Sequence, residues 1–130
     1  MSGENVALIR SLYEAFRRRD LPAIAARIHP SIVVVQTELL PWGGRYEGLD
    51  GFRTFFGKLT QAITSEVEAE LLLEAGDRVV AIGRTHGHVN GSQTPFDLTA
   101  VHVWTIRDGK VAGFEPYIDT PAMLKVLGAS

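Results

Sequence analysis

The spacing of apolar residues indicates a helical first half of the chain. Apolar side chains recur every three or four positions over residues 5–18 and again over residues 49–63, which is the period of a helix that buries one side. A shorter helix is expected over residues 20–28, between an Asp-Leu-Pro start signature and a His-Pro stop signal. The pattern therefore predicts three helices before the main run of strands.

Alternating and β-branched residues indicate strands in the rest of the chain. A first strand is expected over residues 31–37, followed by a loop of Pro and Gly over residues 39–44. Short turns separate four further predicted strands and a last helical segment, at residues 66–74, 78–89, 96–106, 110–118 and 122–127. This order predicts an α+β cone, in which three N-terminal helices pack on a strongly curved antiparallel sheet and enclose a pocket.

Length and charge narrow the classes of function. A chain of 130 residues is expected to form a single domain, residues 1–130. The formal net charge is -2, and the only basic cluster is Arg17 to Arg19, so neither nucleic acid nor an anionic membrane is an expected partner. We interpret the basic cluster as compensation of a helix dipole rather than as a binding patch.

Several kinds of site are not expected. The chain has no cysteine, which excludes disulfides and thiol nucleophiles. No metal site and no cofactor are expected, because the histidines and carboxylates do not show the spacing of metal ligands. The chain shows no signal-peptide pattern and no apolar run long enough to cross a bilayer, so a soluble, cytoplasmic protein is predicted.

Three short motifs occur in an order that is informative. They are Pro41-Trp42-Gly43-Gly44 before Tyr46-Glu47-Gly48, the turn Asp108-Gly109-Lys110-Val111, and the closing Tyr117-Ile118-Asp119-Thr120. In this order the motifs resemble the nuclear transport factor 2 (NTF2-like) superfamily, most closely its SnoaL-like branch. The resemblance implies a pocket for a small apolar or polycyclic ligand and a homodimer formed through the open face of the sheet. That superfamily includes ketosteroid isomerases, polyketide cyclases, limonene epoxide hydrolases, dehydratases and non-catalytic binders, so the fold alone does not give the reaction.

The positions of the isomerase site argue against steroid isomerase activity. That chemistry needs a carboxylate base and an oxyanion hole made of a Tyr and a protonated Asp. By alignment with the resemblance, the base position falls on Gln36, which cannot accept the proton. The oxyanion Tyr falls on Leu12, one position from Tyr13, and the oxyanion Asp falls on Val101.

The last predicted strand keeps a position of the cyclases. SnoaL-like cyclases carry an acid/base Asp ten residues after the turn Gly, where Asp119 stands relative to Gly109. Limonene epoxide hydrolases pair a similar Asp with an Arg-x-Asp motif, which here reads Arg84-Thr85-His86, with His in place of the second Asp. A second interpretation is open, because Asp-Thr-Pro is also a helix-start signature and Asp119 can cap the final helix.

Alternation along two predicted strands suggests which side chains face the pocket. Arg84, His86 and His88 share a face, and the same parity of Val80 and Ile82 favours the covered side for that face. His102 and Trp104 share a face with other apolar residues, where His102 is either a pocket residue or a core histidine bonded to a neighbour.

Two functions are therefore carried forward. The first is a cofactor-independent acid/base enzyme of cyclase, isomerase, dehydratase or hydrolase type, in which Asp119 acts with Arg84 and His86 on a small apolar substrate. The alternative is a non-catalytic small-molecule binder or a dimerisation module of the same fold. In either case the predicted ligand-binding residues are Tyr13, Gln36, Trp42, Phe56, His102, Trp104 and Tyr117.

Overall fold

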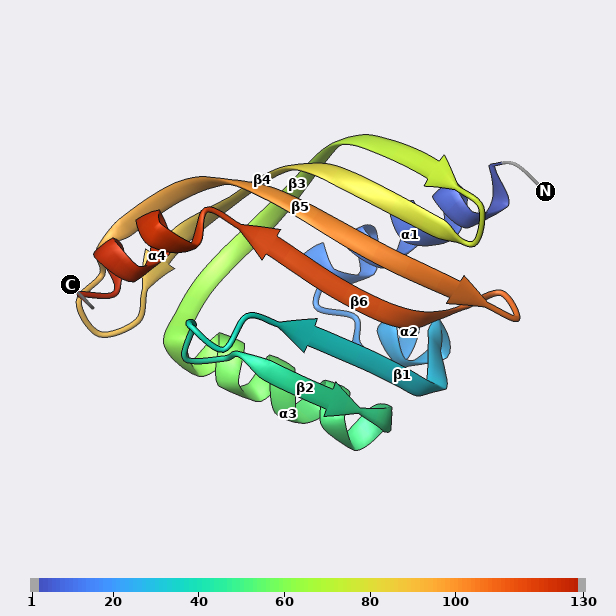
Figure 1. The fold of residues 1–130 in the computed structure, drawn as a ribbon, viewed down its shortest axis with the longest axis horizontal. Helices are drawn as coiled ribbons and strands as arrows, with labels where there is room; N and C mark the ends of the chain where they lie inside the picture. The colour runs from blue at the N-terminus through green and yellow to red at the C-terminus, as the bar shows by residue number, and fades with distance from the viewer. Residues whose placement is uncertain (1–2, 129–130) are drawn as a thin grey trace.

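The computed structural model describes residues 3–128, which form four helices and one six-stranded sheet (Figure 1). The elements, in chain order, are α1 (Glu4–Arg17), α2 (Leu21–Ala26), β1 (Ile28–Gln36), β2 (Gly44–Glu47), α3 (Gly48–Ala62), β3 (Ile63–Ala75), β4 (Arg78–Val89), β5 (Pro95–Arg107), β6 (Lys110–Ile118) and α4 (Thr120–Val126). The α+β class, the three N-terminal helices and the curved sheet are confirmed. None of the helices within residues 3–128 is long and apolar enough to cross a membrane.

The sheet has the strand order β2-β1-β6-β5-β4-β3 and is not closed. Strands β3 to β6 form the predicted antiparallel meander. Strands β1 and β6 pair in parallel, so the sheet is antiparallel except at this one pair. After the meander, β6 returns beside β1 and runs in the same direction, so the first and last long strands of the chain lie next to each other.

Two boundaries in the first half differ from the prediction. Strand β1 begins at Ile28 and includes His29 and Pro30, which were expected to end a helix. The β1–β6 register shifts between Ile28 and Val33, and an irregular pairing of this kind tolerates a proline that lacks the N–H donor. The residues Gly44–Glu47 form β2 against β1, a strand that was not predicted and that begins at the last residue of the predicted loop.

Helices α1 and α3 bury their apolar sides against the concave face of the sheet (Figure 1). The concave face of β4 carries Val79, Ala81 and Thr85, which are all buried. Their neighbours on β5 include His102 and Trp104, also buried, as the alternation on β5 had predicted.

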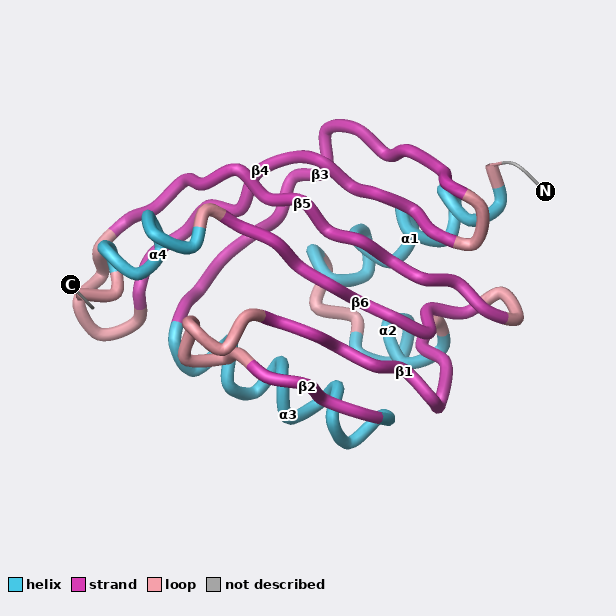
Figure 2. The backbone as a smooth tube through the Cα atoms, in the orientation of Figure 1, coloured by secondary structure: helices cyan, strands magenta, loops and turns pink. Residues whose placement is uncertain are grey.

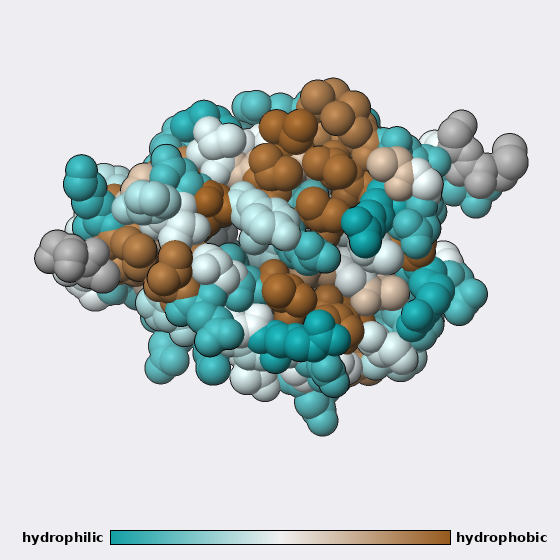
Figure 3. Space-filling model, viewed as in Figure 1, coloured by the Kyte–Doolittle hydropathy of each residue, from teal (hydrophilic) through white to brown (hydrophobic). Residues whose placement is uncertain are grey.

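The predicted parity of β4 was wrong. Val80 and Ile82, together with Arg84 and His86, have the opposite parity to the buried residues of this strand. Apolar side chains occur on both faces here, because the open face also carries the exposed Leu71 and Leu73, which pair with Ile82 and Val80. Figure 3 shows apolar side chains gathered on this open face. Hydrophobic alternation alone could not identify the covered side.

Strand β3 bends where it passes β4, and two glycines make room for it (Figure 2). The register between these strands shifts between Ala69 and Leu71. A Cβ atom at Gly83 would lie 1.8 Å from the carbonyl oxygen of Glu68, and one at Gly87 would lie 1.9 Å from that of Thr64. The backbone of β3 thus occupies space that any side chain would fill, and this close approach brings the first half of β3 over the edge of the concave face.

Candidate functional site

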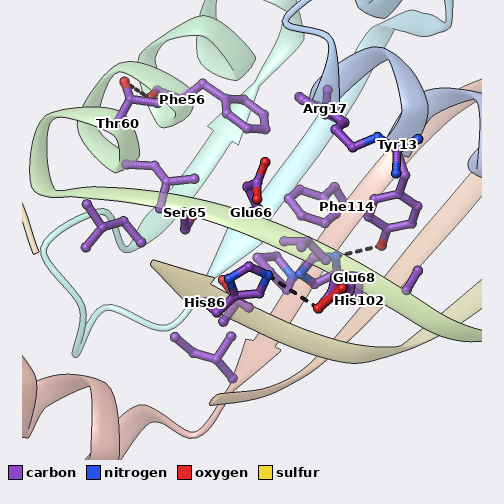
Figure 4. A pocket seen from close by; sticks show the side chains of 18 of the residues that line it. Tyr13, Arg17, Phe56, Thr60, Ser65, Glu66, Glu68, His86, His102 and Phe114 are labelled. Carbon is purple, nitrogen blue, oxygen red and sulfur yellow. Dashed lines mark hydrogen bonds and ion pairs between the residues drawn. The ribbon is translucent and has the colours of Figure 1, made fainter. Parts of the chain in front are cut away.

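A cavity of about 730 Å³ lies between the concave face of the sheet, helices α1 and α3, and the first half of β3 (Figure 4). Aromatic side chains make up much of its wall, and they come from elements far apart in the sequence. They are Tyr13, Phe16, Trp42, Phe55, Phe56, Trp104 and Phe114. Several of these rings contact one another directly, including Trp104 stacked on Phe114 at a centroid distance of 4.1 Å.

Three polar side chains form a chain of hydrogen bonds within this aromatic wall. The indole Nε1 of Trp104 donates to the hydroxyl oxygen of Tyr13 at 2.9 Å, and that hydroxyl lies 2.7 Å from Nδ1 of His102. Figure 4 shows the Tyr13–His102 contact crossing from α1 to β5. The amphipathic period of α1 places Tyr13 next to the buried Leu12 and towards the sheet, and the alternation of β5 places both of its partners on the same face.

The hydrogen bond from Trp104 favours one tautomer of His102. An indole nitrogen can only donate, so the hydroxyl of Tyr13 accepts from Trp104 and has its own hydrogen left to give. If that hydrogen is given to Nδ1 of His102, every group of the contact is satisfied, and on this basis we assign the proton of the neutral His102 ring to Nε2. This tautomer is assigned from the hydrogen-bond network.

Nε2 of His102 faces the cavity. It has no hydrogen-bond partner in residues 3–128. Every fully buried side-chain nitrogen or oxygen in that range has a partner, so Nε2 is in contact with open space. The ring also belongs to the cavity wall. A single N–H donor is therefore directed at the space that a ligand would fill.

Burial keeps both partners of this contact uncharged at neutral pH. Desolvation lowers the pKa of His102 to about 4 from its ordinary 6.5. Desolvation also raises the pKa of Tyr13 above its ordinary value, an effect that the hydrogen bond from Trp104 reduces. The pair can therefore donate a hydrogen bond to a ligand oxygen without introducing a buried charge.

Gln36, at the end of β1, adds a hydrogen-bond acceptor to the cavity wall. Its side-chain Nε2 donates to the carbonyl oxygen of Pro116 at 3.4 Å, and Gln36 is only 5 % exposed. The amide oxygen is then left to face the cavity, whose wall Gln36 helps to form.

Charged side chains line the opening. Arg10, Glu14, Arg17 and Arg19 lie on or next to α1, and Glu66 and Glu68 lie across from them on β3. All six are exposed, so they form the rim rather than the interior. His86 joins this rim, with its Nε2 at 3.4 Å from a carboxylate oxygen of Glu68 (Figure 4). The site thus has an aromatic interior with neutral polar groups and a rim that carries both signs of charge.

Six of the seven predicted ligand-binding residues line the cavity; they are Tyr13, Gln36, Trp42, Phe56, His102 and Trp104. Tyr117 does not, because its side chain is 55 % exposed and donates to Glu115 on the open face. Whether these residues bind a ligand stays a prediction.

The three predicted catalytic residues are not brought together. Asp119 is exposed and accepts a hydrogen bond from the backbone N–H of Ala122 at 3.2 Å, so it caps α4 and is not part of the cavity wall. Arg84 also lies outside that wall and pairs with Asp97 at 2.6 Å. His86 is at the rim. The role of these residues in chemistry stays a prediction, and the cavity itself presents other groups.

Some cavity residues were missed from the sequence. Phe114 could have been found from the register of the last hairpin, which sets it beside Trp104. Glu66 and Arg19 carry no local signal, because their position depends on the bend of β3 and on the end of α1. Among residues 3–128, no group of three or more His, Cys, Asp or Glu is arranged to hold a metal ion.

Comparison with known proteins gives both family and structural matches. The family model described as SnoaL-like domain matches residues 9–114. An NTF2-like protein of unknown function from Burkholderia pseudomallei is 29% identical, with a TM-score of 0.88 and 98% of each chain covered. TerC, co-crystallised with polyporic acid, is also 29% identical, with a TM-score of 0.88 and coverage of 97% of this chain and 99% of that one.

A more distant structure shares the fold. A putative polyketide cyclase from Xanthomonas campestris is 20% identical, with a TM-score of 0.82 and coverage of 95% and 96%. A search of curated proteins gave no match.

Proposed function

The chain belongs to the SnoaL-like domain family, and on that premise we propose that it binds a small, largely apolar molecule carrying an oxygen, which His102 orients inside the cavity. The observation that carries the proposal is the hydrogen-bonded contact of His102 with Tyr13, itself bonded to Trp104, in the wall of an aromatic cavity. With the proton assigned to Nε2, His102 offers one N–H donor to a ligand there. A carbonyl or hydroxyl oxygen of the ligand would accept from this group, while its rings would pack on the aromatic wall.

The size and polarity of the cavity support this ligand class. Cavities that hold drug-sized molecules typically measure roughly 300–1,000 Å³ and combine apolar walls with a few oriented polar groups. The cavity here has about 730 Å³ and presents the donor of His102 and the amide oxygen of Gln36. A ligand with one hydrogen-bond acceptor and one hydrogen-bond donor on an apolar frame can bond to both His102 and Gln36.

A structural relative supports an aromatic ligand. TerC, which is 29% identical over nearly the whole chain, was co-crystallised with polyporic acid. That compound is therefore a rational first probe for the cavity of this chain.

Acid/base catalysis is the second candidate function, suggested by the putative polyketide cyclase that shares this fold. In that case the neutral imidazole of His102 would polarise a substrate oxygen, since donors placed where negative charge develops stabilise a transition state. Use of Asp119 as the acid/base would require its carboxylate to leave the cap of α4. The geometry supports ligand binding better than this reaction.

A titration with polyporic acid tests the binding proposal. Trp42 and Trp104 both line the cavity, so a bound ligand should quench or shift tryptophan emission. We expect saturable binding by the wild type and a roughly tenfold weaker affinity for His102→Leu, which loses the donor. His102→Gln, which keeps an N–H donor, should recover part of the affinity.

His88→Leu is the matched control, because His88 lies on the same sheet but outside the cavity wall. It should bind as the wild type does. Binding by His102→Leu that equals wild-type binding, with both variants folded by circular dichroism, would overturn the proposed role of His102. No emission change in the wild type with polyporic acid or with the naphthyl dyes described below would overturn the binding function itself.

A further inference from the structure

Helix α1 ends in a backbone motif that normally requires glycine, and here the residue is Arg19. The N–H of Arg19 bonds to the carbonyl of Phe16, and the N–H of Asp20 bonds to that of Ala15 at 2.9 Å. With Arg18 as the C-cap, these are the two bonds of a Schellman motif, which holds the next residue in the left-handed region. Arg19 accordingly has φ 57.

Arginine is a poor choice for this backbone position. Glycine adopts the left-handed region without steric penalty, whereas the Cβ of an L residue meets its own backbone there. The dipole of α1 favours cations at this end, and Arg17 and Arg18 already supply them. The side chain of Arg19 is therefore considered by what it contacts.

The side chain of Arg19 lies where two cavities meet. Arg19 lines the main cavity and also a second groove of about 300 Å³ between α1, α2 and α3. Phe16 and Phe56 line both spaces as well, stacked at a centroid distance of 5.1 Å, so they form the partition between them. A charge at this junction can reach a ligand that projects from the main cavity.

The other charges at the rim are partly compensated. Arg17 pairs with Glu14, and Glu68 lies beside His86. The guanidinium groups of Arg10 and Arg19 make no ion pair within residues 3–128, and the same is true of the Glu66 carboxylate. Two uncompensated cations on the α1 side thus face one uncompensated anion on β3.

We propose that Arg19 binds an anionic group of the ligand at the rim of the cavity. The ligand class is then an amphipathic anion, with an apolar ring body beside His102 and a carboxylate, phenolate or similar group at Arg19. This inference rests on the proposed function, because it assigns the outer end of a molecule whose inner end occupies the cavity.

A pair of fluorescent dyes that differ only in charge tests the assignment. Anilinonaphthalene sulfonate carries one negative charge, and phenylnaphthylamine has the same ring body without the sulfonate. We expect the wild type to bind the sulfonate roughly fivefold more tightly than the neutral dye, the effect of one partly exposed ion pair. Arg19→Gln should abolish this preference and leave the affinity for the neutral dye unchanged, whereas Arg19→Lys should keep most of it.

Arg18→Gln is the matched control. It removes a neighbouring cation that lines neither cavity and that lies 3.7 Å from Asp20. The sulfonate preference should survive this change. An equal loss in Arg18→Gln and Arg19→Gln would show a general effect of net charge and overturn the inference. If both dyes bind and the wild type shows no preference, only the inference fails; if neither dye nor polyporic acid binds, the proposed function fails as well.

A thermal comparison separates a binding role from a structural one. If Arg19 is retained for its charge, Arg19→Gly should lose the sulfonate preference and at the same time melt about 2 °C higher than Arg19→Gln, because glycine suits the left-handed position. A glycine variant that melts at or below the glutamine variant would show that the position is not strained by its side chain, and would remove the reason for assigning Arg19 a function.

Discussion

Replacing Tyr13 with Phe should destabilise the protein through two partners at once. The hydroxyl of Tyr13 accepts from Trp104 and contacts Nδ1 of His102, at 2.9 and 2.7 Å. Both partners are buried, at 1 % and 7 % exposure, so water cannot readily replace the lost oxygen on the Trp104 side. The substitution removes one oxygen atom and leaves the ring in place.

The expected cost follows from the number of groups left without a partner. A buried polar group that loses its hydrogen bond costs about 1–3 kcal/mol, and two groups are affected here. Water entering from the cavity can satisfy part of the His102 side, so we expect a loss of about 3 kcal/mol in the free energy of unfolding. For a domain of this length that corresponds to a fall of roughly 10 °C in Tm.

Urea unfolding followed by tryptophan emission measures this loss directly, because Trp42 and Trp104 are both in the core. Tyr117→Phe is the matched control, since its exposed hydroxyl bonds only Glu115, and it should change the unfolding free energy by less than about 0.5 kcal/mol. A Tyr13→Phe variant as stable as that control would refute the role given to the Trp104–Tyr13–His102 chain.

Four further predictions follow from the same structure. First, His102 stays neutral in the folded protein, so stability should fall as the pH drops from 6.5 towards 4, by about 3 kcal/mol in total, and His102→Gln should flatten this part of a urea-unfolding pH profile. The sign follows because only the unfolded chain binds the proton in that window; a histidine NMR titration that places the His102 pKa near 6.5 would contradict it. Second, Gly83→Ala should lower the free energy of unfolding by more than about 2 kcal/mol or prevent folding, because its Cβ would lie 1.8 Å from the carbonyl oxygen of Glu68. Gly57→Ala, in the middle of α3 with no atom within 4 Å of the added Cβ, should stabilise the protein by about 1 kcal/mol. Thermal melts that rank the two variants equally would reject the account of β3. Third, Asp119→Ala should cost about 1 kcal/mol through loss of the α4 cap and Asp119→Asn much less, with polyporic acid binding unchanged in both, so weakened binding in the Asn variant would return Asp119 to the site. Fourth, the open sheet face is proposed to form a homodimer, so sedimentation velocity at micromolar concentration should show a dimer that Val103→Glu on that face dissociates, and a monomeric wild type would count against it.

The elements and the family could be predicted because their signals are local and repeated. The helical period of α1 and α3 and the turns between β3 and β6 occur in the sequence much as the structure shows them. The resemblance to the SnoaL-like branch of the NTF2-like superfamily is confirmed by the family match and by the structural relatives. Strand β2 was missed because its pairing with β1 is a tertiary contact made by a segment of turn-forming composition.

The site was only partly predictable, for a different reason. Trp104 and His102 could be placed because their strand has one apolar face that continues into the core. In β4 both faces carry apolar side chains, so the sequence does not show whether Val79 or Val80 faces the core. The pairing of Val79 with Trp104 on β5 determines that it is Val79. The sequence around Asp119 fits both a catalytic acid/base and a helix cap, and the structure shows the cap.

Burial and charge together determine which way round a ligand would lie. The inner groups, Tyr13 and His102, stay uncharged because desolvation disfavours their ionised forms, so an anionic end placed beside them would have no counter-charge and would lose its hydration. The uncompensated cations are at the rim, where Arg19 remains in contact with solvent. A ligand with one charged end therefore has one favourable orientation, with its neutral oxygen at His102 and its charge outward.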